Sequence, residues 1–366
     1  MSDMEVAAAG GDQVVLSQRG ELRSFLWLSL RNGLLNLITL TLYRFWGKTE
    51  VRRRLWATTY LNDEAFEYTG RGVELFLGFL LALGVIALPF LCVVFGAQFL
   101  GPQLAAMVLL PFYAFLGFLA GFGRFTAFRY LASRSSWRGV RFHLRGSAAR
   151  YGLSWLGLSL LSGVTMGWFW PAAERRLAGR LWDGLSFGDK DFKFRIDDAR
   201  RLEPIYGAYA LGWICGIVGY VVFVAVIFSA LAPQLKAGGA PPTPTLHEFL
   251  VIYAAAGALA LGYSVVFSPF HAAMLRSVVA GIGFGEVRFR LRVKWFDIAL
   301  LTLSNLVLAA VSLGLLMPFI EARTRKFLIG RVETAGAIDL AAIRQAPDTG
   351  PRTGEGLADA FGIATV

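Results

Sequence analysis

The stretch LFLGFLLALGVIALPFLCVVFGA, residues 75–97, decides the class of this protein. It carries no charged residue, and ~20 consecutive apolar residues are enough for a helix to cross the ~30 Å hydrocarbon core of a bilayer. The whole chain has the same character, since 56% of its 366 residues are hydrophobic and its mean hydropathy is +0.55. We therefore predict a polytopic membrane protein.

Three further long apolar segments lie at 104–123, 206–232 and 249–270. Together with 75–97 they pair into two predicted transmembrane hairpins. The second hairpin turns at 233–248, where Pro and Gly are frequent and indicate a loop rather than a helix.

Three shorter and more polar segments, at 25–43, 152–170 and 298–319, resemble one another. Each is Leu-rich and ends in aromatic or proline residues and a basic run, as in YRFWGKTEVRRRLW at 43–56. Recurrent similarity within a chain indicates duplication. The predicted internal repeats are 25–72, 150–197 and 296–333.

Short stretches in which apolar and charged residues alternate predict strands at the membrane surface. They lie at 64–72, 138–146, 190–197 and 285–293. The predicted fold is thus an all-α polytopic membrane protein with two transmembrane hairpins, three repeated segments that re-enter or span the membrane, and small cytoplasmic β elements.

Basic residues predict which side of the membrane each loop faces, because cytoplasmic loops carry the excess of Lys and Arg. Residues 124–150 hold seven such residues and 171–204 hold eight, whereas 233–248 holds only Lys236. If all seven apolar segments spanned, 171–204 would face outside. If the shorter segments re-entered, which polar segments buried by protein can do, every basic loop would be cytoplasmic. Both arrangements stay open.

The chain is expected to comprise a cytoplasmic segment at 1–24, an integral membrane domain at 25–333 and a disordered cytoplasmic tail at 334–366. Cys92 and Cys215 lie inside apolar segments without a metal-binding spacing, which excludes a disulfide framework or a zinc site.

Two sets of polar residues are candidate site residues. Basic residues beside apolar segments are candidates for contact with an anionic lipid headgroup or another anion. They are Lys48, Arg52, Arg53, Arg54, Arg175 and Arg176. Polar residues within apolar segments are costly there and usually have a partner or a function. They are Arg31, Asn32, Asn36, Glu74 and Asn305.

Known catalytic patterns are absent from the sequence. It has no GxSxG, HExxH or Walker motif, and its three histidines have no ligand-spaced partner. We therefore expect no enzyme and no cofactor. The net charge of +11 is assigned to topology and to a partnership with bilayer lipids, anionic ones in particular, rather than to nucleic acid.

The run NLITLTLYRFWGKTEVRRRLW, followed by FEYTGRGVELFLGFL, resembles the YjgN-like family of bacterial inner-membrane proteins of unknown function. The positions that match the family pattern are Asn36, Tyr43, Trp46, Lys48, Phe66, Tyr68, Gly70, Gly72, Glu74, Leu75 and Phe76. The resemblance implies a multi-pass protein of the bacterial inner membrane and no chemistry.

Two function classes remain. The first is a transporter or channel for a small solute, because repeated polar segments at membrane depth are typical of transporter sites. The second is a non-transporting membrane module that binds anionic lipid or organises partner proteins.

Overall fold

The computed structural model describes residues 12–195, 205–237 and 245–345. These residues are mostly helical, but their strands also form an eight-stranded antiparallel sheet in the order β12-β11-β10-β9-β8-β7-β6-β5. Three further strands pair as β2-β3-β4, and β1 pairs with β13. The predicted helical character is therefore confirmed, but the prediction of only small β elements was wrong, because the short strands join edge to edge.

The helices have the following bounds. They are α2 (Leu22–Ile38), α3 (Arg44–Ala57), α4 (Gly72–Ala82), the π-helix η1 (Leu83–Ala87), α5 (Leu88–Ala97), α6 (Pro102–Ser133), α7 (Ala148–Val164), α8 (Trp170–Gly184), α10 (Ile205–Ala237), α11 (Leu246–Val266), α12 (Ser268–Gly281), α13 (Trp295–Val311) and α14 (Met317–Ile329). The strands are β1 (Asp12–Gln13), β2 (Leu16–Gln18), β3 (Thr59–Leu61), β4 (Glu64–Ala65), β5 (Glu67–Tyr68), β6 (Ser135–Trp137), β7 (Val140–Leu144), β8 (Leu185–Phe187), β9 (Lys190–Phe194), β10 (Ile282–Phe284), β11 (Val287–Leu291), β12 (Val332–Ala335) and β13 (Ala337–Ile338).

The same arrangement of strand, helix hairpin and strand occurs five times, and in each case the two strands pair antiparallel. Unit 1 is β2–α2–α3–β3, and unit 2 runs from β5 through the α4–α6 hairpin to β6. Unit 3 is β7–α7–α8–β8, unit 4 runs from β9 through α10–α12 to β10, and unit 5 is β11–α13–α14–β12. Both ends of the hairpins of units 2 to 5 therefore meet the eight-stranded sheet, and those of unit 1 meet the β2-β3-β4 sheet.

One backbone hydrogen bond recurs in all five units. The residue that follows the first strand donates its N–H to the carbonyl of the residue immediately before the second strand, at 2.8 to 3.0 Å. The pairs are Arg19 with Thr58, Thr69 with Arg134, Arg145 with Gly184, Arg195 with Gly281, and Arg292 with Arg331. This bond fixes the two feet of each hairpin side by side.

Neighbouring units are joined by two-residue β-turns, as the alternating sequence stretches require. Asn62–Asp63 and Arg138–Gly139 have positive φ at both turn residues, and Gly188 and Gly285 supply it at the first. The last helix of each unit packs against the first helix of the next, and α14 of unit 5 packs against α2 of unit 1. The units thus close into a ring.

The helix hairpins of units 1, 3 and 5 are short and end in the same turn. Their first helices each have 17 residues. In the turns, the backbone N–H groups of Thr41, Gly167 and Gly314 donate to carbonyls five residues earlier, at 2.7, 2.7 and 2.8 Å. The segments predicted at 25–43, 152–170 and 298–319 therefore each contain a helix, a tight turn and the return of the chain toward the sheet.

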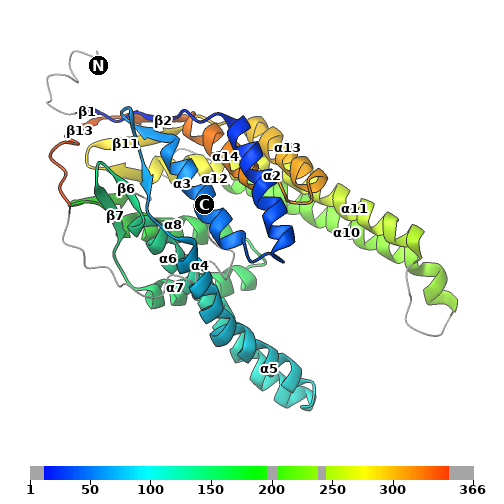
Figure 1. Ribbon diagram of the computed structural model, residues 1–366. Coiled ribbons are helices and arrows are strands. Elements are labelled where there is room, and N and C mark those ends of the chain that lie inside the picture. The colour runs from blue at the N-terminus through cyan, green and yellow to red at the C-terminus, as the bar shows by residue number, and fades with distance from the viewer. Residues whose placement is uncertain (1–11, 196–204, 238–244, 346–366) are drawn as a thin grey trace.

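The hairpins of units 2 and 4 are much longer and project from the rest of the molecule (Figure 1). Three helices are long and apolar enough to cross a membrane, over Gln103–Ser133, Ile205–Ala232 and Leu246–Val266. The stretch 75–97 falls on α4, η1 and α5, because a π-helical turn divides it. These lengths are consistent with a membrane protein.

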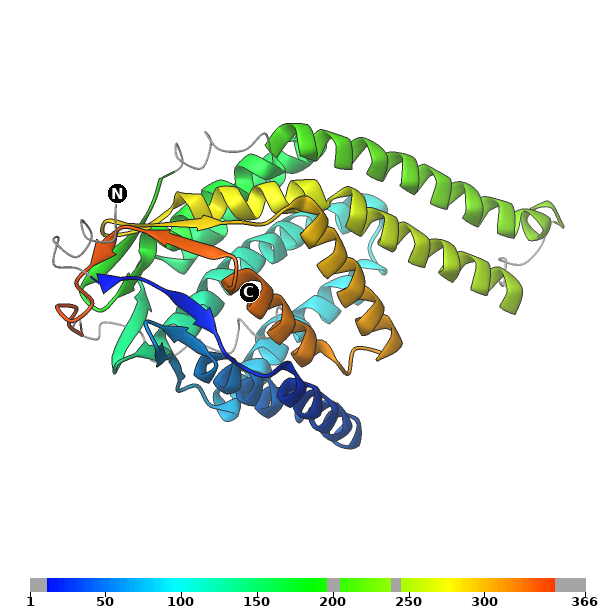
Figure 2. The same cartoon turned by 90° about the horizontal axis from the view of Figure 1, so that it is seen from above.

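The face of the sheet away from the hairpins encloses a hydrophobic core. Leu61, Trp137, Phe187 and Phe284, each the last strand residue before a β-turn, are buried there together. The β1–β13 pair brings the two ends of the described chain together over this region (Figure 2). The beginning of the predicted disordered tail is in fact ordered, since 334–345 contributes strands and buried side chains to this core. Residues 346–366 lie outside the described part.

Candidate functional site

Of the predicted intramembrane polar residues, Arg31 and Asn32 join the two helices of unit 1. Arg31 forms an ion pair with Glu50 across the hairpin. Asn32 is buried, and its Nδ2 donates to the Gly47 carbonyl at 3.4 Å. The Oδ1 atom of Asn36 is buried and has no hydrogen-bond partner among the described residues. Arg31 and Asn32 thus hold α2 against α3.

Asn305 has a similar role in unit 5. Its Oδ1 accepts from Arg323 at 2.8 Å, and its Nδ2 donates to Thr324 Oγ1 at 3.0 Å. Arg323 also donates to Ser304 Oγ at 2.8 Å. Because a buried polar group without a partner is costly, this clasp sets the register of α13 against α14.

Glu74 lies in a polar network at the foot of unit 2. Its carboxylate pairs with Arg134 at 3.1 Å and accepts from the Tyr130 hydroxyl at 3.0 Å. Tyr130 and Tyr68 are hydrogen-bonded, and Arg52 donates to the Tyr68 hydroxyl at 3.4 Å. Arg52 is only 4% exposed, so its side chain lies inside the protein.

The glycines of the TGRG motif (69–72) make this network possible. A Cβ atom on Gly70 would overlap the Tyr68 hydroxyl and lie 2.8 Å from the Tyr130 hydroxyl. A Cβ atom on Gly72 would lie 2.9 Å from the Trp46 backbone. The motif residues that match the family pattern are therefore explained by packing and hydrogen bonding.

Four basic residues form ties between neighbouring units, and three of them were missed at the sequence level. Each side chain donates to the carbonyl two residues before the first helix of the next unit. The pairs are Arg53 with Gly70, Arg129 with Gly146, Arg276 with Val293, and Lys326 with Gly20, at 3.5, 2.5, 2.6 and 3.0 Å. The Lys326 tie closes the ring from unit 5 to unit 1.

A fixed offset could have revealed these ties, because each basic residue stands six positions before the first residue of the following strand.

The remaining candidates lie elsewhere. Arg54 donates to the Ser24 carbonyl at 3.4 Å, and Arg176 lies 5.2 Å from the centre of the Phe169 ring. Lys48 and Arg175 are half-buried.

A central cavity of 320 Å³ lies among the feet of four units. The helices of units 1, 2 and 5 line it at matching positions, three or seven residues before the following strand. These residues are Trp56, Phe128, Ala132, Arg325 and Ile329. Ser135 Oγ accepts from the Trp56 indole at 2.8 Å, and Arg325 lies 4.9 Å from the Trp56 ring centre. The wall is therefore apolar with one guanidinium.

One helical turn further from the sheet, eleven residues before the following strand, each unit carries a titratable side chain. We call this set the axial row, and it consists of Lys48, Arg124, Glu174, His271 and Glu321. Burial raises the pKa of Glu174, and the nearby positive charge of Arg124 opposes that rise. Burial lowers the pKa of His271. Glu321 accepts from Arg325 at 3.0 Å.

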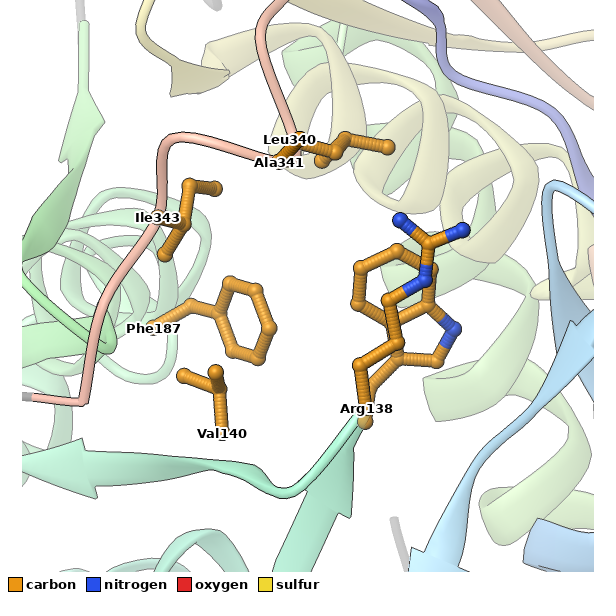
Figure 3. A pocket seen from close by; sticks show the side chains of 7 residues that line it. Arg138, Val140, Phe187, Leu340, Ala341 and Ile343 are labelled. Atoms are coloured by element: carbon orange, nitrogen blue, oxygen red, sulfur yellow. The ribbon is translucent and has the colours of Figure 1, made fainter.

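Two further cavities flank this centre. One of 290 Å³ lies at the sheet end, where Leu340 and Ile343 of the C-terminal segment face Phe187, Val140 and the side chain of Arg138 (Figure 3). The other, of 490 Å³, lies between the tip of the unit 3 hairpin and the α10–α11 hairpin. In the described residues, no group of three or more His, Cys, Asp or Glu side chains could hold a metal ion.

The fold and these sites define a helical membrane-type protein in which paired helices stand on antiparallel strands, most of which form one sheet. The chain belongs to the family described as bacterial protein of unknown function (DUF898), whose model matches residues 15–360. This agrees with the resemblance to YjgN-like proteins. Neither a curated protein nor a solved structure matches the chain.

Proposed function

We propose that this chain is a multi-pass protein of the bacterial inner membrane, with two spanning and three re-entrant hairpins. The α6 helix has 32 residues and its counterpart α3 has 14, so α6 extends roughly 27 Å farther from the sheet. That distance approaches the ~30 Å hydrocarbon core. The tips of the short hairpins would then end within one leaflet, with the sheet in the cytoplasm.

The tips of the short hairpins have the surface that such a position requires. Leu40, Val164 and Leu313 are 84%, 82% and 91% exposed. A soluble protein rarely gathers such side chains on a projecting tip. The charge bias agrees, because the loops richest in Lys and Arg then lie on one side.

The five units also support the predicted internal repetition and extend it from three copies to five. The two-strand pairing, the foot hydrogen bond and the inter-unit packing recur at fixed offsets. Independent origins would not be expected to reproduce these contacts. Duplication of one unit, with lengthening of the second and fourth hairpins, is the simplest account.

Within this architecture we favour a transporter of a small solute and not an enzyme. The axial row carries this proposal, because it places five titratable side chains at the same offset from the following strand, and three of the helices that bear them also line the central cavity. Ionisable groups at this depth usually serve transport or a buried pair. The filled core beneath the sheet argues for a gated site over an open pore.

The alternative is a module that binds anionic lipid without transport. It has less support, because Arg53, Arg129, Arg276 and Lys326 donate to backbone carbonyls and so are tied to the fold. The exposed Arg176 is the kind of residue that would contact an anionic lipid headgroup in this alternative.

Flux measurements separate the two functions. Purified protein in liposomes would be tested by stopped-flow swelling with glycerol, glycine and potassium acetate. We expect faster entry of at least one solute than in protein-free vesicles, and a change in Glu174→Gln but not in Glu286→Gln, a control at an exposed β-turn. Rates equal to those of empty vesicles for all solutes, with anionic lipid retained in native mass spectrometry, would favour the alternative.

Cysteine labelling tests the topology separately. In a variant without Cys92 and Cys215, a membrane-impermeant maleimide added from outside should label Phe99→Cys at the turn of the unit 2 hairpin. Lys190→Cys on the sheet should react only after permeabilisation. Labelling of Lys190→Cys from outside would refute the proposed orientation.

A further inference from the structure

The cavity of 490 Å³ beside unit 3, here called the side cavity, has the size of a small-molecule site. The turn of the α7–α8 hairpin forms one wall, with Ser162, Gly163, Met166 and Gly167. Helices α8, α10, α11 and α12 supply the other walls with aromatic side chains. Those residues are Trp170, Tyr209, Trp213, Tyr263, Phe267, Phe270 and His271.

The aromatic walls are held in place before any ligand binds. The Tyr209 hydroxyl donates to the Gly167 carbonyl at 2.8 Å, and the Trp213 indole donates to the Met166 carbonyl at 3.0 Å. Tyr263 and Phe267 stack with their ring centres 4.1 Å apart. A preorganised wall loses little conformational entropy on binding, so flat faces are available for stacking at low cost.

The lining contains no Asp, Glu, Lys or Arg. Its polar side-chain groups are the Ser162, Tyr209 and Tyr263 hydroxyls, the Trp170 and Trp213 indoles and the His271 imidazole. Of these, Ser162, Tyr209 and Trp213 donate to backbone carbonyls. Burial lowers the pKa of His271, which keeps the imidazole neutral near pH 7. A charged ligand would have no countercharge there, and burying an unpaired charge is strongly unfavourable.

The side cavity also lies next to a surface made for lipid. Met166, which lines it, is 75% exposed at the hairpin tip. With the proposed membrane placement, on which this step rests, a ligand would enter from the bilayer interior. Entry from lipid selects molecules that dissolve in it.

We propose that the side cavity binds a neutral, lipid-soluble molecule with a flat aromatic or quinone head group. The rings stack on Trp170 and Trp213, and the Tyr263 hydroxyl and the His271 imidazole hydrogen-bond to its carbonyl oxygens. A phospholipid fits this lining less well, because its phosphate would meet no cation. No redox step is implied.

Two glycines on α7 give a matched test. Gly163 lines the side cavity and Gly157 does not, and a Cβ atom at either position would meet nothing within 4 Å. Gly163→Phe should fill the cavity, whereas Gly157→Phe adds the same ring elsewhere on the helix. Tyr263→Phe removes one hydroxyl from the cavity. Tyr253→Phe is its control, because Tyr253 lies on the same helix outside the cavity.

Menadione is the probe, and quenching of tryptophan fluorescence in detergent is the readout. Two of the ten tryptophans line the cavity. We expect saturable quenching in wild type and Gly157→Phe, at least tenfold weaker binding in Gly163→Phe, and several-fold weaker binding in Tyr263→Phe but not in Tyr253→Phe. Equal or non-saturable quenching in all variants would overturn the proposal. The proposal would also be overturned if Gly163→Phe lost a co-purified phospholipid but still bound menadione as wild type does. His271 belongs to both the side cavity and the axial row, so menadione binding and solute flux are measured separately in each variant.

Discussion

Replacement of Gly70 by alanine tests the polar network at the foot of unit 2. The added Cβ would overlap the Tyr68 hydroxyl and lie 2.8 Å from the Tyr130 hydroxyl. Both tyrosines are buried, so neither ring can move away into solvent. Overpacking of this kind costs ~1–3 kcal/mol.

A second loss adds to the overpacking. Displacement of Tyr130 breaks its hydrogen bond to Glu74, now 3.0 Å long, and a hydrogen bond to a charged group contributes ~1.5–3 kcal/mol. Partial retention of that bond brings the expected total to about 2–4 kcal/mol. Because Gly70 does not have a positive φ, no backbone strain contributes.

Reversible unfolding in SDS, followed by tryptophan fluorescence, measures this change in the free energy of unfolding. Gly101→Ala is the control, since Gly101 is also a non-helical glycine and a Cβ there would meet nothing within 4 Å. We expect the free energy of unfolding of Gly101→Ala to lie within ~0.5 kcal/mol of the wild-type value. If Gly70→Ala were equally mild, Tyr68 and Tyr130 would not be packed as described.

Three further perturbations have defined outcomes. Burial raises the pKa of Glu174. The contribution of this group to stability is therefore present below its unfolded pKa and is lost as pH rises through the higher folded pKa. Glu174→Gln should remove this dependence, so its melting temperature should fall less between pH 4 and pH 7 than that of wild type. Equal falls would contradict the burial of that carboxyl. Leu340→Ala and Ile343→Ala, as separate variants, should each lower the free energy of unfolding by ~2–4 kcal/mol in the SDS assay, because both side chains are buried in the sheet core. Unchanged stability would mean that the C-terminal segment does not pack there. Gly167→Ala should cost ~1–2 kcal/mol, since its φ is +91° and its Cβ would lie 3.1 Å from the Tyr209 hydroxyl; a melting temperature equal to wild type would argue against this turn.

Sequence periodicity was a good guide to local structure. The hydrophobic runs located the long helices, and the alternating stretches located strands in the right places, as at 138–146 and β7. The division of 75–97 by η1 was missed because hydrophobic periodicity does not register it; the one local mark is Pro89, just after the turn, which cannot donate a helical hydrogen bond. Elements were therefore found more reliably than their interruptions.

The joining of the strands was beyond the reach of that pattern. Stretches such as 285–293 are too short to show partners, and pairing depends on the helix hairpin that brings β12 beside β11. The same limit applies to the axial row. Arg124 and His271 lie within or beside long apolar helices, and only the common offset from the following strand relates them to Lys48, Glu174 and Glu321.

The basic residues show why charge alone did not identify a site. Next to an apolar segment, an arginine satisfies the positive-inside bias whether its guanidinium meets lipid or protein. The structure directs Arg53, Arg129 and Arg276 to backbone carbonyls of the adjoining unit, where each hydrogen bond from a charged donor contributes ~1.5–3 kcal/mol. The same side chains can therefore set the orientation in the membrane during insertion and hold the ring together afterwards. A selective site would then depend on residues that differ between units, and the axial row, with Lys, Arg, Glu, His and Glu at one position, differs in this way.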